Sequence, residues 1–231
     1  MAIIRLDRFI ANQTGLSRNE SKEMLKSLRV TVNGKTEKNY DAKINTETDR
    51  VCLDGSEILY NEYIYLLMNK PKGILTATED KRQKTVLDLV PSELKRKKLA
   101  PVGRLDKDTT GLLMLTDDGV FAHCVISPKS NIEKEYIAIL DGDITDEMID
   151  SFSNGVTLAD GSVCMPAKLK RLGPCVASVI IGEGKYHQIK RMFGTVGLGV
   201  NELKRVRIGD IVLPKDLDEG SLVLLKNKPN F

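Results

Sequence analysis

The sequence lacks the features typical of membrane proteins, disulfide-rich secreted proteins and zinc proteins. No apolar run approaches the roughly 18–20 residues that span a bilayer, and residues 1–7 hold no signal-peptide core. The four cysteines, Cys52, Cys124, Cys164 and Cys175, include no C-x-x-C pair, and there are only two histidines. This spacing supports neither a zinc site nor a disulfide framework, so we expect reduced thiols in a cytoplasmic protein that binds no metal.

Motifs for nucleotide cofactors are also missing. The chain has no glycine-rich phosphate loop, no Walker motif and no dinucleotide fingerprint. We therefore expect that no cofactor is bound and that any chemistry uses side chains alone.

Charge is abundant but nearly balanced, with 35 basic and 32 acidic residues and a net charge of +3. That net charge is too small to indicate a nucleic-acid partner, so the distribution matters more. Residues 1–38 contain eight basic and four acidic side chains, which places the basic excess at the N-terminal end. The apolar content of 41% supports hydrophobic cores, and 231 residues can form one large domain or two smaller ones.

Residues 1–58 have the pattern of a small α/β domain. Apolar residues in 6–10 recur at helical spacing, and Ser17 with Glu20 predicts a capping box at the start of a second helix. Segment 30–34, Val-Thr-Val-Asn-Gly, predicts a strand that runs into a hairpin turn. Two helices followed by short strands are therefore expected.

Basic residues are spaced three or four apart along the second predicted helix, so they line one side of it; they are Arg18, Lys22, Lys26 and Arg29. Such a stripe can track phosphates, although a solvated helix face is the alternative. Segments 5–7, 16–18 and 30–34 resemble the S4 RNA-binding domain, and this resemblance implies that Arg5 also contacts RNA.

The remainder, residues 59–231, is expected to be a second domain, reached through a linker at 54–62. Strands are predicted at 63–68, 112–116, 134–140, 176–181, 206–213 and 221–225, and helices at 85–89, 146–152 and 188–196. Many strands with few helices indicate an α+β fold with a mixed, mostly antiparallel sheet.

The most informative segment is 103–113, Gly-Arg-Leu-Asp-Lys-Asp-Thr-Thr-Gly-Leu-Leu. Asp106 lies in a polar turn directly before an apolar strand, and a loop of this kind can present a carboxylate at a cleft. Asp108 is expected to be mainly structural, as a loop cap.

Five segments, 69–73, 103–113, 133–138, 184–193 and 203–209, resemble in their order the RNA pseudouridine synthases of the RsuA/RluA superfamily. The string Tyr-His-Gln-Ile-Lys-Arg-Met-Phe is most similar to the RsuA-type branch. This resemblance implies isomerisation of a uridine in 16S rRNA, at position 516, without a cofactor. The implied partner is 16S rRNA or a small-subunit assembly intermediate, bound by a monomer with no membrane contact.

The resemblance also implies roles for individual residues. Asp106 matches the catalytic aspartate, and Lys190 matches the basic residue that pairs with it, with Arg191 as the other candidate. Tyr136 matches the active-site tyrosine, which can stack on uracil and serve in proton transfer. RNA contacts are implied for Arg104, which can fill the gap left by the extruded base, and for Gln188, Arg191 and the structural or RNA-contacting His187.

Several alternatives stay open at this point. The target can be large-subunit rRNA, or the chain can be a non-catalytic S4-type ribosome-assembly factor. A glycoside hydrolase needs two carboxylates, and Asp108 is the nearest partner for Asp106, although in an extended segment it points to the opposite face. The route is also open, because Asp106 can attack C1′ or C6 or remove the C2′ proton.

Overall fold

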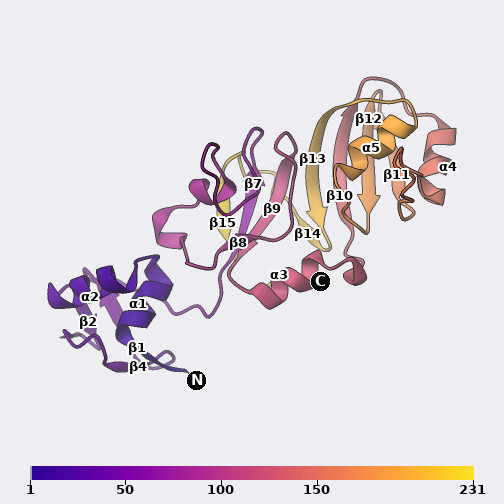
Figure 1. Ribbon diagram of the computed structural model, residues 1–231. Coiled ribbons are helices and arrows are strands. Elements are labelled where there is room, and N and C mark those ends of the chain that lie inside the picture. The colour runs from indigo at the N-terminus through magenta and orange to yellow at the C-terminus, as the bar shows by residue number, and fades with distance from the viewer. Residues whose placement is uncertain (1) are drawn as a thin grey trace. The chain divides into compact units, whose positions relative to one another are not determined.

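The computed structural model describes residues 2–231, and the chain folds into two compact units (Figure 1). The first unit runs to Ile64 and takes in Val90–Leu99, and the second consists of Tyr65–Leu89 and Ala100–Phe231. The division after Ile64 lies near the boundary expected after residue 58. The return of Val90–Leu99 to the first unit is not predicted by the sequence.

The first unit contains two short helices and several small strands. Its elements are β1 (Ile3–Arg5), α1 (Leu6–Thr14), α2 (Arg18–Lys26), β2 (Val30–Val32), β3 (Lys35–Thr36), β4 (Lys43–Asn45), β5 (Val51–Leu53), β6 (Ser56–Glu57) and the 3-10 helix η2 (Ser92–Leu94). Strand β1 pairs with β4, and a four-stranded sheet has the order β3-β2-β5-β6. Buried apolar side chains form its core: Leu6, Phe9, Ile10, Leu25, Val30, Ile44 and Val51.

Local signals in the first unit are confirmed. The Ser17 side chain accepts a hydrogen bond from the Glu20 backbone N–H at 3.2 Å, and the Glu20 carboxylate accepts one from the Ser17 N–H at 2.7 Å. This is the predicted capping box. Asn33 and Gly34 both have positive φ angles, 52° and 79°, as a two-residue hairpin turn requires.

The chain leaves the first unit later than predicted, so the linker expected at 54–62 is wrong over most of its length. Asp54 and Gly55 form a second hairpin turn, after which Ser56–Glu57 pairs with β5. Asn61 donates its backbone N–H to Gln13 Oε1 at 3.0 Å. The turn residues at 54–55 therefore belong to a hairpin. The sequence pattern did not separate this from a linker, because hairpins and linkers use the same residue types.

The second unit is built on one large sheet. Its elements are β7 (Tyr65–Lys70), η1 (Val86–Leu89), β8 (Ala100–Pro101), β9 (Thr110–Thr116), α3 (Gly119–Ile126), η3 (Pro128–Ser130), β10 (Lys134–Leu140), α4 (Asp146–Asn154), β11 (Lys168–Gly173), β12 (Val176–Ile181), α5 (Gln188–Thr195), β13 (Val200–Ile208), β14 (Ile211–Val212) and β15 (Leu222–Leu224). The strand order is β11-β12-β10-β13-β9-β7-β15, with β14 on β13 and β8 on β9. Only β9 and β13 run parallel within this described sheet, so the predicted α+β class with a mixed, mostly antiparallel sheet is confirmed.

Three elements differ from the sequence prediction. The Asp-Asp-Gly segment at 117–119, whose composition is typical of a turn, leads into helix α3, because the buried Asp118 side chain accepts from the Phe121 N–H at 2.9 Å. Strand β11 was not predicted, since apolar and polar residues alternate only weakly along it. Strand β13 begins at Val200, six residues before the predicted start, and includes charged residues that the predicted strand omitted. A turn at 209–210 divides the predicted 206–213 strand into the end of β13 and the antiparallel β14.

Gly111 allows β9 and β13 to approach each other at their parallel contact. Its φ is +99°, and it lies opposite Arg205 in the strand register. A Cβ atom at position 111 would lie 2.2 Å from the Arg205 carbonyl oxygen. The loop that carries Asp106 ends at this point, so the close strand contact helps to place that loop.

We expect Gly111→Ala to lower the free energy of unfolding by at least about 2 kcal/mol. The left-handed backbone costs about 1–2 kcal/mol for an L-residue, and the overlap with β13 adds about 1–3 kcal/mol. Thermal unfolding followed by circular dichroism measures the effect, with a fall in melting temperature of at least about 4 °C. Gly161→Ala is the control, because Gly161 has φ +81° but no atom within 4 Å of the added Cβ. Equal destabilisation by both variants would contradict a role for the β9–β13 contact.

Candidate active site

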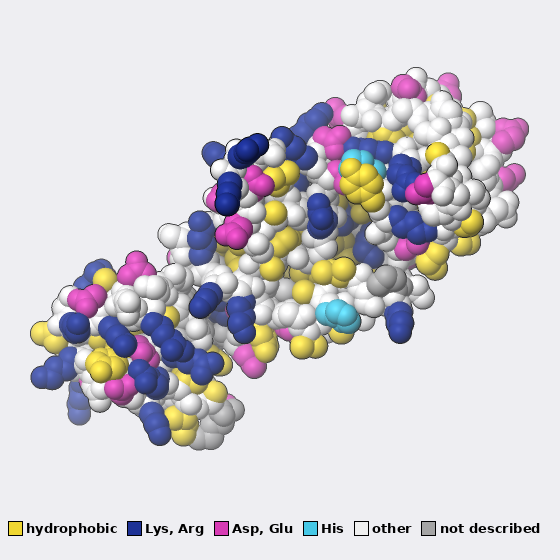
Figure 2. Space-filling view, viewed as in Figure 1, with side chains coloured by type: hydrophobic (Ala, Val, Ile, Leu, Met, Phe, Trp, Pro, Cys, Tyr) yellow, Lys and Arg dark blue, Asp and Glu magenta, His cyan; other side chains and the backbone are white. Residues whose placement is uncertain are grey.

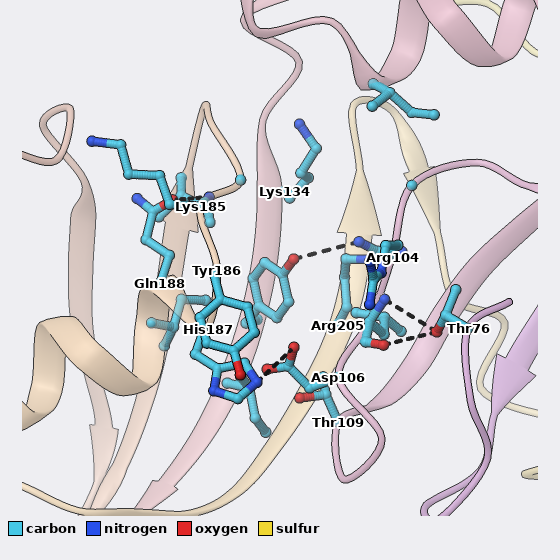
Figure 3. A pocket seen from close by; sticks show the side chains of 18 of the residues that line it. Thr76, Arg104, Asp106, Thr109, Lys134, Lys185, Tyr186, His187, Gln188 and Arg205 are labelled. Atoms are coloured by element: carbon cyan, nitrogen blue, oxygen red, sulfur yellow. Dashed lines mark hydrogen bonds and ion pairs between the residues drawn. The ribbon is translucent and has the colours of Figure 1, made fainter. Parts of the chain in front are cut away.

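A pocket of about 780 Å³ opens on the second unit. It is lined by residues from 75–77, 102–109, 134–136, 181–190 and 203–208, which are far apart in the sequence. Figure 2 shows Lys and Arg side chains around this side of the molecule, and Figure 3 shows the lining residues from close by. The volume is in the range of pockets that hold a small organic ligand such as a nucleoside.

Asp106 lies in this pocket, on the loop between β8 and β9. Its side chain is 28% exposed, with Oδ1 3.5 Å from His187 Nε2 and Oδ2 4.0 Å from Lys190 Nζ (Figure 3). The backbone of the preceding residue, Leu105, is fixed by the Thr76 hydroxyl, which donates to the Leu105 carbonyl at 2.8 Å and accepts from the Leu105 N–H at 3.2 Å. The carboxylate is therefore held in position by its backbone and remains accessible to a ligand.

Lys70, at the end of β7, holds the other side of the loop. Its side chain is fully buried, and its ammonium donates to the carbonyl oxygens of Pro71, Lys107 and Thr109 at 3.1, 3.3 and 3.0 Å. Burial lowers the pKa of Lys70 to about 8. In the sequence alone, segment 69–73 contributes only to the family resemblance. The signal for this role was a lysine that ends an otherwise apolar strand.

Lys190 contacts both carboxylates of the loop, but it binds Asp108 more closely than Asp106. Its ammonium lies 2.6 Å from each oxygen of Asp108 and 4.0 Å from Asp106. The hydrogen bond from Lys190 lowers the pKa of Asp108. Asp108 was expected to cap the loop, and the structure instead gives it the role of holding Lys190 beside Asp106. The pair is partly exposed, so its contribution is mainly to position rather than to stability.

Tyr136 lies on β10 in the pocket wall and is 8% exposed. Its hydroxyl accepts a hydrogen bond from Arg205 NH1 at 3.4 Å. Arg205 is itself buried and donates from Nε to the Leu112 carbonyl at 2.8 Å, while its NH2 has no partner among residues 2–231. Sequence reasoning did not single out Arg205 as a site residue. The signal that could have found it was its place two residues after Leu203, on the same face of the strand as that buried side chain.

The turn that precedes α5 is held by Gln188. Its Oε1 accepts from the Lys185 N–H at 2.9 Å, and its Nε2 donates to Glu183 at 3.0 Å. The residue is 4% exposed, so both ends of its amide serve the turn. His187 adopts a left-handed backbone with φ 48°, and its ring stacks on that of Tyr186 with 3.9 Å between centroids.

Charge in the pocket is predominantly positive. The basic lining residues are Arg104, Lys107, Lys134, Lys185, Lys190 and Arg205, and the acidic ones are Asp80, Asp106 and Glu183. Arg104 is exposed, and Arg191, just outside the lining, binds Asp160 at 2.5 Å. This balance favours an anionic ligand. Among residues 2–231 no group of three or more His, Cys, Asp or Glu could hold a metal ion.

The basic residues predicted to bind RNA in the first unit differ in their surroundings. Arg18 and Lys26 are exposed, whereas Lys22 lies over the Tyr40 ring at 4.7 Å. Ion pairs within the unit occupy three of the predicted residues: Arg5 binds Asp7 and Asp41, Lys26 binds Glu23, and Arg29 binds Asp54. In the part of the chain that is described, no helix is long and apolar enough to cross a membrane.

Comparison with known proteins gives consistent results. Residues 64–195 match the model for the RNA pseudouridylate synthase family. The chain is 42% identical to an uncharacterized RNA pseudouridine synthase of Bacillus subtilis (strain 168), covering 94% of this chain and 92% of that protein. It is 40% identical to the ribosomal small subunit pseudouridine synthase A of Escherichia coli (strain K12), covering 94% of each.

A solved structure described as a pseudouridylate synthase also matches, with a TM-score of 0.68, 35% identity and 96% coverage of both chains. Similarity of this extent includes both the pocket and the sheet that carries it. The chain therefore belongs to the RNA pseudouridylate synthase family.

Proposed function

We propose that this protein is a cytoplasmic enzyme that converts a uridine of small-subunit ribosomal RNA to pseudouridine, with Asp106 as the catalytic carboxylate. The observation that carries this proposal is the position of Asp106, partly exposed in a cationic pocket with His187 and Lys190 beside it. Relatives named as small-subunit synthases support the ribosomal substrate. Uridine 516 of 16S rRNA is the first site to examine.

The reaction breaks the bond between N1 of uracil and C1′ of ribose and forms a bond between C5 and C1′. C5 loses a proton and N1 gains one, so substrate and product are isomers. Asp106 can attack C1′ or C6 or remove the C2′ proton. Each route needs an ionised carboxylate, and the Lys190 ammonium lies 4.0 Å from Asp106 as a countercharge.

The target base must leave its stack to reach Asp106. The ring of Tyr136 offers a flat apolar surface in the pocket wall on which uracil can rest, and Arg205 holds the Tyr136 hydroxyl. Arg104 is exposed at the pocket, and its planar guanidinium can stack where the base was.

A glycoside hydrolase is a weaker reading of the same residues. A hydrolase of this class uses a second carboxyl group, which in the protonated form acts as a general acid. Asp108 is bound by Lys190 through both oxygens, and that contact lowers the pKa of Asp108, so its carboxyl group is ionised. It is therefore poorly suited to donate a proton to a leaving group.

The first unit is proposed to bind RNA as an S4-like domain. Two helices precede a small sheet, as the resemblance implies, and Arg18 and Lys26 are exposed on α2. Exposed cations of this kind bind phosphates and release counterions. The first unit would thus supply affinity, and the second unit would supply the chemistry.

We expect Asp106→Asn to reduce pseudouridine formation by at least about 10²–10⁴-fold, because the amide cannot act as nucleophile or base. Chemical mapping of pseudouridine in rRNA incubated with the protein measures this and also separates small- from large-subunit targets. RNA binding should be retained. Asp108→Asn is the matched control and should lose less activity, since it only loosens Lys190. Normal pseudouridine yield from the Asp106 variant would overturn the assignment. Release of free uracil by the unsubstituted protein would favour the hydrolase.

We expect activity to fall as the pH rises through about 8, because Lys70 then loses its charge and one N–H donor to the loop. Stability should change in the opposite direction. The pKa of Lys70 is depressed from 10.5 to about 8, so between these values the unfolded state binds more protons and folding becomes more favourable with rising pH. Single-turnover rates and melting temperatures at about pH 7 to 10 test both trends. In Lys70→Met the step near pH 8 should vanish, and its persistence would exclude Lys70 as the cause.

We expect RNA affinity to fall with salt, and the double change Arg18→Gln and Lys26→Gln to reduce the slope of log K against log salt by about 1 to 2. Filter binding at several salt concentrations measures the slope. Lys170→Gln with Lys215→Gln is the control, because these exposed lysines lie in the second unit outside the pocket. An unchanged slope in the α2 variant would remove the basis for RNA binding by α2.

A further inference from the structure

Tyr186 is an exposed aromatic side chain at the pocket. It is 75% exposed, more than any other large apolar or aromatic residue among those described. One face of its ring is covered by His187, with the two rings 3.9 Å apart and inclined by 17°. The other face is left to solvent, and Figure 3 shows the ring in front of His187 at the edge of the pocket. An aromatic ring in this position contributes little buried area to folding.

The exposed ring is nevertheless held firmly by its surroundings. The left-handed backbone of His187 turns the chain sharply, and Gln188 ties Lys185 to Glu183 across the same turn. Arg191 also donates to the Tyr186 carbonyl at 3.5 Å. The backbone therefore presents the Tyr186–His187 pair at a fixed place, which suits a ring that receives a ligand.

The stacked pair is next to the candidate catalytic group. His187 Nε2 lies 3.5 Å from Asp106 Oδ1, so the edge of the inner ring reaches the carboxylate. A base stacked on the open face of Tyr186 would be separated from the His187 ring by the Tyr186 ring. Its plane would therefore lie two stacking distances from the His187 ring, whose edge contacts Asp106. It therefore cannot be the reacting uracil, which must reach the carboxylate itself.

Given the proposed function, on which this step rests, we infer that Tyr186 is a stacking platform for a nucleobase that neighbours the extruded uridine in the substrate RNA. Aromatic side chains hold unpaired bases in single-stranded RNA by stacking, and every base offers a flat face. The predominantly positive charge of the pocket lining favours the phosphates of the same strand. Tyr186 would hold the strand beside the target and leave the reacting base free to enter the pocket.

A fluorescence experiment tests the platform directly. The chain has no tryptophan, so Tyr186→Trp introduces a single tryptophan where the stacking is proposed. With Asp106→Asn added to prevent turnover, binding of an RNA that spans the mapped uridine should quench the fluorescence. An abasic residue on one side of the uridine should weaken the quenching. If abasic replacement leaves the quenching unchanged on both sides of the uridine, the platform is refuted.

Kinetics supply the second test. We expect Tyr186→Ala to raise KM about tenfold, since stacking of one base has an effect of this size, with a smaller change in the single-turnover rate at saturating RNA. Tyr186→Phe should restore the affinity, because the ring and not the hydroxyl makes the contact. Tyr63→Ala, at an exposed tyrosine of the first unit, is the control. Affinity in Tyr186→Ala equal to that of the unsubstituted protein, or Phe as damaging as Ala, would overturn the inference.

The two proposals fail in different ways. If the unsubstituted protein makes no pseudouridine in any rRNA, the proposed function fails. Quenching of the Tyr186→Trp variant by single-stranded oligouridylate still reports stacking in that case. If pseudouridine forms normally but Tyr186→Ala has no effect on KM, only the platform fails.

Discussion

One buried ammonium group organises the loop on which the candidate chemistry depends. Lys70 is fully enclosed, and its three N–H groups bind carbonyl oxygens of Pro71, Lys107 and Thr109. A buried carbonyl left without a donor costs about 1–3 kcal/mol, and the ammonium supplies a donor to each of the three, although the Lys107 carbonyl also accepts from the Gly73 N–H. Asp108 lies between the two loop carbonyls that the ammonium binds, and Asp106 directly precedes them.

Close strand packing then connects the loop to the remainder of the site. Gly111 permits the parallel contact of β9 with β13, and the same contact brings Arg205 to the Leu112 carbonyl and the Tyr136 hydroxyl. Tyr136 and Arg205 are thus contributed by the neighbouring strands β10 and β13, and Asp106 by the loop that leads into β9. A rigid base of this kind suits a reaction in which a base must detach, turn and reattach without leaving.

Much of this architecture was predictable where a local pattern determines the outcome. The Ser17–Glu20 capping box and the Asn33-Gly34 hairpin formed as expected, and β10 and β12 have the predicted bounds. Two of the differences share one cause, which is that polar turn residues serve several structures. Asp118 caps a helix although Asp-Asp-Gly is typical of a turn, and Gly55 closes a hairpin where a linker was predicted.

The sequence by itself determined the family resemblance, the fold class and the segments that meet in the pocket, because each depends on residue identity in a local order. Tertiary structure alone decided which groups touch. Lys190 binds Asp108 closely and Asp106 only at 4.0 Å, Lys70 is a buried support of the loop, and Tyr186 is an exposed ring backed by His187. Lys190 and Asp108, for example, are 82 positions apart, and no local pattern encodes distances between chain segments that only packing brings together.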